Sequence, residues 1–160
     1  MNNALTLHRM LLEKDIPHEI VRLPRRISSA DQLPAVLALP AKRCLAVRLY
    51  EVDDQHAAVI APPDLVVPVL AVRDATGGRR VRAASDDTIS SVTGYAAGLV
   101  APVALPDTVP VYVDQAVADQ ADDATIVYTA TGESGTALGI GLAGLLATCA
   151  AKPAALAGQQ

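Results

Sequence analysis

Two glycines four positions apart, followed by a proline, place the strongest constraint on how this chain folds. Gly94 and Gly98 lie in the segment 94–102, between an expected helix capped by Ser85 and an expected strand over 109–113. Glycine adopts backbone angles that a side chain forbids, and proline fixes its own. Such a loop can direct bare N–H groups toward a ligand. Glycines between elements also serve as plain turn residues, so both interpretations stay open.

The rest of the pattern predicts helices and strands without a regular alternation. Apolar spacing and capping residues predict helices over 4–14, 28–39, 62–74, from 85 to the glycine loop, and over 142–151. Alternating polarity predicts strands over 18–23, 43–50, 56–61, 80–84, 109–113, 125–129 and 136–140, with 43–61 as a hairpin. We therefore expect an α/β domain of mixed α+β type, with one curved, mixed β-sheet flanked by helices.

The length of the chain fits a single domain over 1–160. We expect its core over about 4–151 and a frayed tail over 152–160. The chain has four Tyr and no Phe or Trp, so the core must consist mainly of Val, Leu, Ile and Ala, and an aromatic stacking surface for RNA is not expected. No signal peptide or membrane-length apolar run is present, so a cytoplasmic protein without a membrane partner is expected.

Charge and ligand-type residues argue against several other classes of protein. The formal net charge is −4, which argues against tight non-specific nucleic-acid binding and against a DNA partner. The basic residues concentrate in 1–48 and the acidic residues in 85–160. The two cysteines lie far apart without a Cys-x-x-Cys pattern, and none of the three histidines has a partner in a motif. We expect neither a metal site nor a cofactor.

Several blocks, in their order and spacing, resemble the YbaK / prolyl-tRNA-editing domain family. The resemblance runs from about Leu5 to Leu146 and rests on the blocks 17–19, 42–47, 94–102, 109–114 and 131–138. Members of this family are small proteins that hydrolyse wrongly charged aminoacyl-tRNA. The resemblance implies an editing-domain fold and an aminoacyl-tRNA deacylase that acts in trans on the 3′-aminoacyl end of a mischarged tRNA. It also makes tRNA-Pro a candidate substrate and an aminoacyl-tRNA synthetase a candidate partner.

The same resemblance implies a set of site residues. In the family, a lysine two residues before a leucine on the first core strand faces the glycine loop, and Arg43 occupies that position here. Strand alternation puts Arg43 on the face of Leu45, whereas Lys42 would reach in through a bulge, so Arg43 is favoured. The expected catalytic residues are Gly94, Gly98 and Arg43, and the expected substrate contacts are Lys42, Tyr95, Ala97, Pro102, Gly132 and Ser134.

Hydrolysis of an aminoacyl ester requires few catalytic groups, because the ester is already activated. A positioned water and N–H donors near the two glycines would suffice, while Arg43 would anchor a phosphate or ribose without acting as a base. Two departures from the family pattern support a second hypothesis. Arg43 replaces the lysine, and Glu133 and Ser134 replace basic or histidine side chains. The alternative is a catalytically weak or inactive protein that binds aminoacyl-tRNA or nucleotides.

Two further groups of residues have open roles. Asp114 matches an acid of the family, and a cap for the following short helix is its favoured role. Arg22, Arg25 and Arg26 could contact an acceptor stem or belong to a solvated loop. The whole interpretation requires that the glycine segment fold against the first core strand and leave a polar crevice beside a cationic side chain.

Overall fold

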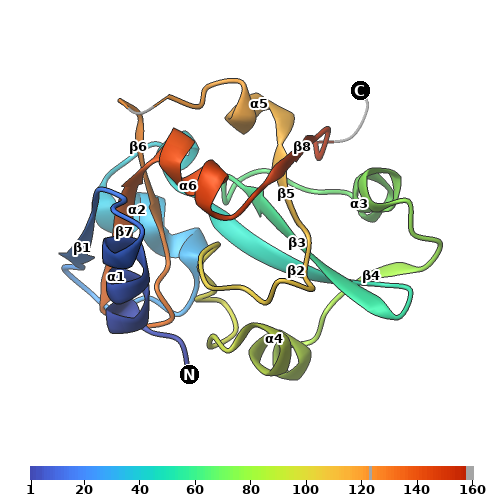
Figure 1. Ribbon diagram of the computed structural model, residues 1–160, viewed down its shortest axis with the longest axis horizontal. Helices are drawn as coiled ribbons and strands as arrows, with labels where there is room; N and C mark the ends of the chain where they lie inside the picture. Colours follow the sequence, from blue (N-terminus) through green and yellow to red (C-terminus); the bar gives the residue numbers. More distant parts are fainter. Residues whose placement is uncertain (123, 158–160) are drawn as a thin grey trace.

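Two β-sheets organise the part of the chain that the structure describes, residues 1–122 and 124–157. In this computed structural model, the smaller sheet is antiparallel and has the order β1 (His18–Arg22), β7 (Thr136–Gly141), β6 (Ile126–Thr129). The larger sheet has the order β4 (Val81–Ala83), β2 (Ala46–Val52), β3 (Gln55–Ala61), β5 (Val111–Asp114), β8 (Lys152–Ala154). Its β4–β2–β3 part is antiparallel, whereas β5 runs parallel to both β3 and β8 (Figure 1).

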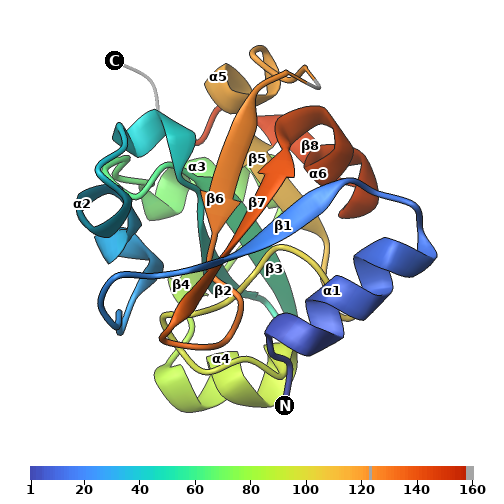
Figure 2. The same cartoon turned by 90° about the vertical axis from the view of Figure 1, so that its left-hand side faces the viewer.

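The expected mixed α/β fold is confirmed, but the expectation of one sheet is wrong, because the strands divide between two sheets. The described residues form six α-helices: α1 (Ala4–Glu13), α2 (Leu33–Leu37), α3 (Val69–Thr76), α4 (Asp86–Thr93), α5 (Gln115–Ala118) and α6 (Leu142–Thr148). Figure 2 shows α1 beside β1 of the smaller sheet, and Figure 1 shows α3 next to β4 at the opposite end of the molecule. Among the helices of 1–122 and 124–157, none combines the length and apolar character that crossing a bilayer requires.

Local capping signals account for most helix starts. The Ser85 side chain accepts the N–H of Thr88 and begins α4, as expected. Ser29 forms a capping box that begins the 3₁₀ turn η1 (Ala30–Gln32), directly before α2.

The helix expected from residue 62 begins only at Val69, after Pro68. Prolines in the intervening segment lack an N–H and disfavour helical backbone in the preceding residue, so the earlier start was wrong.

The two sheets meet at the start of β2. Cys44 forms a parallel bridge with Tyr128, and the Leu45 N–H donates to the Tyr128 carbonyl at 2.9 Å. Directly before this junction, the 3₁₀ turn η2 (Ala41–Arg43) replaces the expected first residues of the strand. Arg43 therefore lies outside the sheet, and its expected position on the strand face of Leu45 is wrong. Hydrogen bonds that close the turn override the alternating pattern of the sequence.

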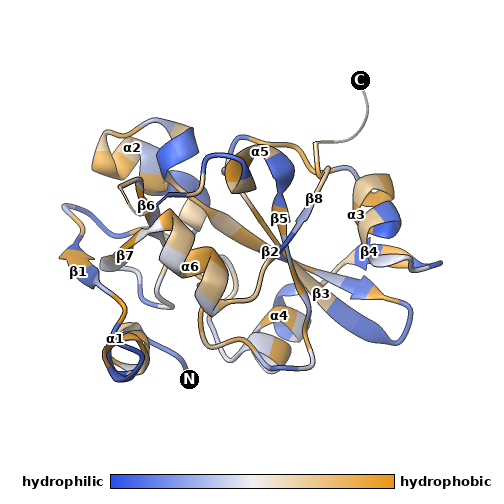
Figure 3. Cartoon of the chain, turned by 45° about the horizontal axis from the view of Figure 1, so that its top comes forward, coloured by the Kyte–Doolittle hydropathy of each residue, from blue (hydrophilic) through white to orange (hydrophobic). Residues whose placement is uncertain are grey.

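An aliphatic core fills the space around both sheets, as the composition predicted. Its buried members include Leu7, Leu11, Leu45, Ile60, Leu138 and Ile140. Tyr95 is the one aromatic residue in this group, and its hydroxyl donates to the Val103 carbonyl. The hairpin β2–β3 crosses the centre of the fold, with apolar residues in the middle and a hydrophilic tip (Figure 3). Asp53 adopts a positive φ of 53° in this tight turn.

The C-terminal segment is part of the fold rather than a frayed tail. Lys152–Ala154 pairs with β5, and Leu156 is 0% exposed. The Leu156 N–H donates to the Asp114 carboxylate at 3.3 Å. A three-residue strand that contains proline has no alternating pattern, so the sequence could not reveal this pairing. Residues 158–160 of the expected tail lie outside the described residues.

Replacing Leu156 with alanine should lower the free energy of unfolding by about 2–4 kcal/mol, because it leaves a cavity among buried side chains. Urea denaturation of the full chain would measure the change. Leu70→Ala is the matched control, since Leu70 is 66% exposed and should change stability by less than about 0.5 kcal/mol. Equal effects of the two substitutions would show that the C-terminal segment does not pack as described.

Candidate functional site

Gly94 ends helix α4 and ties it to the N-terminus. Its φ of 74° is the left-handed conformation that favours glycine, and its N–H donates to the Ser90 carbonyl at 3.0 Å. The Gly94 carbonyl accepts the Asn2 N–H at 2.7 Å. The Asn2 side chain also donates to the Thr93 carbonyl at 3.0 Å. Gly94 is therefore required by the helix terminus and by packing, whatever else the loop does.

Gly98 lies where the loop passes closest to the segment before η1. Its φ is 85°, and a Cβ at this position would lie 2.5 Å from the Ser28 carbonyl oxygen. The Gly98 carbonyl accepts the Ala30 N–H at 2.8 Å. The Ala97 and Gly98 N–H groups have no hydrogen-bond acceptor among residues 1–122 and 124–157, and Gly98 is exposed. This short stretch can still offer donors to a ligand.

The large side chains of the glycine loop pack against other apolar side chains. Leu99 is 7% exposed and belongs to a buried apolar cluster with Cys44 and Ala46 at the start of β2. The loop therefore does fold against the first core strand. The space between them is filled by apolar side chains, so the polar crevice expected beside a cation does not form there. Tyr95 is 0% exposed and belongs to the core, which corrects its expected role as a substrate contact.

Three other expected substrate contacts, Pro102, Gly132 and Ser134, lie in three different places. Pro102 is buried and borders a hollow that neither Lys42 nor Arg43 lines. Gly132 has a φ of 92°, and a Cβ there would lie 2.4 Å from the Asn2 carbonyl oxygen and 2.9 Å from the Tyr95 ring. Gly132 thus packs beside the glycine loop. Ser134 borders a separate surface hollow together with Arg26.

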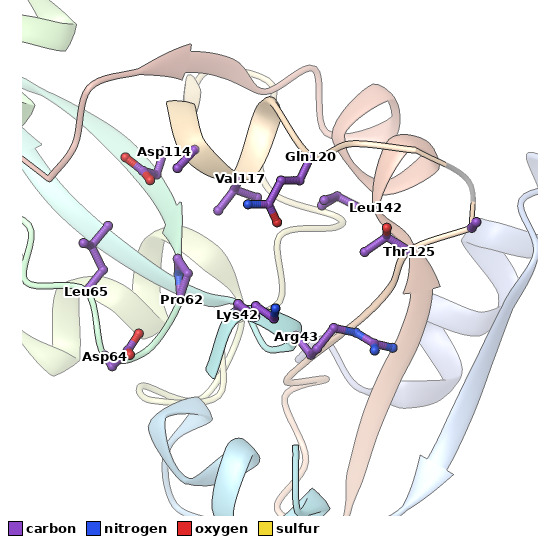
Figure 4. A pocket seen from close by; sticks show the side chains of 12 residues that line it. Lys42, Arg43, Pro62, Asp64, Leu65, Asp114, Val117, Gln120, Thr125 and Leu142 are labelled. Carbon is purple, nitrogen blue, oxygen red and sulfur yellow. The ribbon is translucent and has the colours of Figure 1, made fainter. Parts of the chain in front are cut away.

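Lys42 and Arg43 line a cleft of about 520 Å³ that the glycine loop does not reach (Figure 4). Its walls come from η2, the segment after β3, the end of β5 with α5, the start of β6 and the first residue of α6. The lining residues are Lys42, Arg43, Pro62, Asp64, Leu65, Asp114, Ala116, Val117, Gln120, Ala124, Thr125 and Leu142. The structure therefore brings both expected cations together but separates them from Gly94 and Gly98.

Arg43 is held in place by the neighbouring strand. Its Nε donates to the Ile126 carbonyl at 2.7 Å, which leaves the terminal nitrogens of the guanidinium available. Arg43 is half-buried and Lys42 is exposed. Within 1–122 and 124–157, neither side chain forms an ion pair. Two cations of this kind can bind an anionic group, and an oriented guanidinium suits a phosphate.

Asp114 supplies a carboxylate to the same cleft. It is 7% exposed and stands at the N-cap position of α5, yet its side chain makes no capping hydrogen bond. It accepts the Leu156 N–H instead, so the expected capping role is wrong. The sequence could not show this because the partner lies in the C-terminal segment. Asp64, on the segment after β3, adds a second, exposed carboxylate.

The thiol nearest the cleft is unsuited to nucleophilic chemistry. Burial raises the pKa of Cys44 to about 11, although the Arg43 charge opposes this. Burial likewise raises the pKa of Cys149 to about 11. A thiol with such a pKa is almost wholly protonated at neutral pH, and the thiolate is the reactive form. Covalent catalysis by cysteine is therefore not supported.

Two histidines come together in a way that the sequence did not reveal. His8 Nδ1 lies 2.8 Å from His18 Nε2, and His18 Nδ1 lies 2.7 Å from the Ile16 carbonyl oxygen. The pair joins α1 to β1 and does not line the cleft. No group of three or more metal-ligating side chains occurs within residues 1–122 and 124–157.

Replacing Gly98 with alanine should lower the free energy of unfolding by at least about 1–2 kcal/mol, because alanine is strained at a positive φ. The close approach of the Ser28 carbonyl should add to this cost. Gly135→Ala is the control, since a Cβ there meets nothing within 4 Å and should leave stability unchanged or raise it by up to about 1 kcal/mol. Denaturant titrations would compare the two, and a neutral Gly98→Ala variant would contradict this packing of the loop.

Comparison with known proteins identifies the family to which this chain belongs. The sequence profile of the aminoacyl-tRNA editing domain matches residues 25–147. The chain belongs to the aminoacyl-tRNA editing domain family.

Two relatives agree with this assignment. A proline–tRNA ligase of Desulfovibrio desulfuricans is 33% identical over 86 residues, which are 54% of this chain and 15% of the ligase. One from Bacillus subtilis is 28% identical over 116 residues, which are 71% of this chain and 20% of the ligase. This chain therefore matches only a minor part of those ligases.

Two solved structures share the fold. Hypothetical protein APE2540 has a TM-score of 0.81 at 19% identity, with 92% of this chain and 95% of the other covered. A candidate trans-editing enzyme for prolyl-tRNA synthetase has a TM-score of 0.75 at 19% identity, with coverages of 89% and 87%. At these identities the likeness is one of fold.

Proposed function

We propose that this protein is a trans-acting aminoacyl-tRNA deacylase, whose substrate is the 3′ end of a mischarged tRNA bound in the cleft beside Lys42 and Arg43. The observation that carries the proposal is this cleft, with two cations and a buried carboxylate, in a chain of the editing-domain family. The ligase relatives support tRNA-Pro as the first tRNA to test. A synthetase is a candidate partner, and an activity on tRNA fits a cytoplasmic protein.

The reaction needs only water and positioned polar groups. Water adds to the ester carbonyl carbon, the bond from that carbon to the ribose oxygen breaks, and the free amino acid and the ribose hydroxyl result. Lys42 and the Arg43 guanidinium would hold the terminal phosphate and ribose. Gln120 and Thr125 line the same cleft and offer polar hydrogens near the ester. Arg43 keeps its proton, so it positions the substrate and does not act as a base.

The Ala97 and Gly98 amides remain the second candidate source of oxyanion donors. They have no acceptor among the described residues, which supports such a role. The two glycines do not line the cleft that holds the cations, so the reaction proposed here does not depend on them.

A second function is favoured by the apolar packing between the glycine loop and β2. Leu99 and Cys44 fill the space where a polar crevice was expected. Together with Arg43 at the position of the family lysine, this packing supports a protein that binds aminoacyl-tRNA or nucleotides with little or no turnover. The two functions predict the same ligand but different rates.

Lys42→Ala and Arg43→Ala should each lower kcat/KM for release of labelled amino acid from mischarged tRNA by roughly 10- to 100-fold, the loss expected for a charge-assisted hydrogen bond. Ala-, Cys-, Ser- and Thr-tRNA are the substrates to compare. Arg9→Ala, an exposed cation on α1, is the control and should keep full activity. Inertness of the unaltered protein on every species would refute the enzyme and leave the binding function.

Arg43→Lys separates a degenerate enzyme from an active one. A large gain in hydrolysis would show that the natural chain is a weakened enzyme, whereas a loss would show that Arg43 suits this cleft. Binding of tRNA should weaken as salt rises in either case, because phosphate contacts release counterions. Affinity independent of salt would contradict a tRNA ligand for this cleft.

A further inference from the structure

Opposite charges line the two ends of the Lys42–Arg43 cleft. Figure 4 shows Asp64 and Asp114 toward one end, Arg43 toward the other, and Lys42 between them. In the described part of the chain, no ion pair joins these acids to these bases within 4.0 Å. The cleft therefore presents an anionic end and a cationic end that do not neutralise each other by direct contact.

The acidic end is built into the fold rather than formed by mobile surface side chains alone. Asp114 is 7% exposed, and the Leu156 N–H holds its Oδ1 at 3.3 Å. This hydrogen bond anchors the carboxylate at the end of β5. A buried carboxylate with one amide partner retains capacity for a further donor, and an ammonium group is the donor that best matches its charge.

Apolar side chains cover part of the wall. Val117 is 9% exposed and Leu142 is 2% exposed, and both line the cleft together with the half-buried Leu65. A ligand that fits has an anionic group, an ammonium group and a small apolar group. The end of an aminoacyl-tRNA carries all three, as its terminal phosphate, its α-ammonium and its amino-acid side chain.

We infer that Asp114, together with Asp64, binds the free α-ammonium group of the amino acid. The cleft therefore accepts aminoacyl esters and rejects N-acylated aminoacyl esters. This inference rests on the proposed function and adds a specificity to it. An N-acyl group removes the positive charge and leaves the buried Asp114 carboxylate without its ligand partner. The carboxylate then keeps only the Leu156 N–H, and loss of the charge-assisted hydrogen bond to the substrate should make discrimination between the two substrates strong.

The test compares alanyl-tRNA with N-acetylalanyl-tRNA as substrates for the full chain. The unaltered protein should hydrolyse the free-amine substrate with a kcat/KM roughly 10- to 100-fold higher. Asp114→Asn keeps a carbonyl oxygen for the Leu156 N–H and removes the charge. It should lower kcat/KM for the free-amine substrate and leave the N-acetyl substrate unchanged, which reduces the preference to a few-fold. Asp64→Asn should act in the same direction with a smaller effect, because Asp64 is exposed.

Asp107→Asn is the matched control, since Asp107 is exposed and does not line this cleft; it should keep the full preference. Equal hydrolysis of both substrates by the unaltered protein would overturn the inference and leave the deacylase proposal standing. Asp114→Glu restores the charge and should recover part of the preference, which a purely structural role would not predict.

A binding measurement separates this inference from failure of the proposed activity. Non-hydrolysable alanyl-amide analogues of adenosine 5′-phosphate, with and without an N-acetyl group, can be titrated into the protein. Tighter binding of the free-amine analogue, lost in Asp114→Asn, would support the inference even if no ester is hydrolysed. Equal affinity for the two analogues would overturn it.

Discussion

Backbone pairing links the two sheets at one short segment, where Cys44 pairs with Tyr128 and the Leu45 N–H donates to the Tyr128 carbonyl. The strand β2 begins just after this junction, at Ala46, and the chain before it forms the turn η2 outside the sheet. Arg43 then reaches the Ile126 carbonyl of the same strand β6. If Arg43 were a strand residue on the face of Leu45, its charge would point toward the apolar core that contains Leu45, and burying it there would cost several kcal/mol. The cationic end of the cleft therefore depends on where the two sheets join.

Features of the fold with local causes could be predicted from the sequence, and those with distant causes could not. Ser85 begins α4 because its side chain satisfies a free N–H at the helix start, and two aspartates make the tight turn between β2 and β3. Those signals lie within a few residues. The strand β8 exists because β5 offers it an edge, and the burial of Leu156 completes a distant cluster. Nothing within the segment 152–156 itself encodes that pairing.

The candidate site shows the same division between local and distant causes. Lys42 and Arg43 line one cleft, but the glycine loop does not, and the strand argument assigned Arg43 to the wrong element. Leu99 of the glycine loop clusters with Cys44 and Ala46, whereas the strand argument had placed Arg43 on the opposite face, that of Leu45. The glycines were identified as special for the right physical reason, their backbone angles. Their immediate partners, Asn2 and Ser28, are distant in sequence, so their structural role was invisible.

The electrostatics of the cleft favour selection over tight binding. A net charge of −4 repels a polyanion at long range, so attraction to tRNA must come from a few local cations. Acidic groups at one end of the same cleft reduce that attraction further for any ligand that lacks a compensating positive charge. A ligand that carries both charges gains at both ends, and removal of its ammonium or of its phosphate loses one of them. Hydrolysis separates these two charges onto two products, each of which keeps only half of the contacts. In the proposed deacylase, an arrangement of this kind would bind the intact ester best and would release both products.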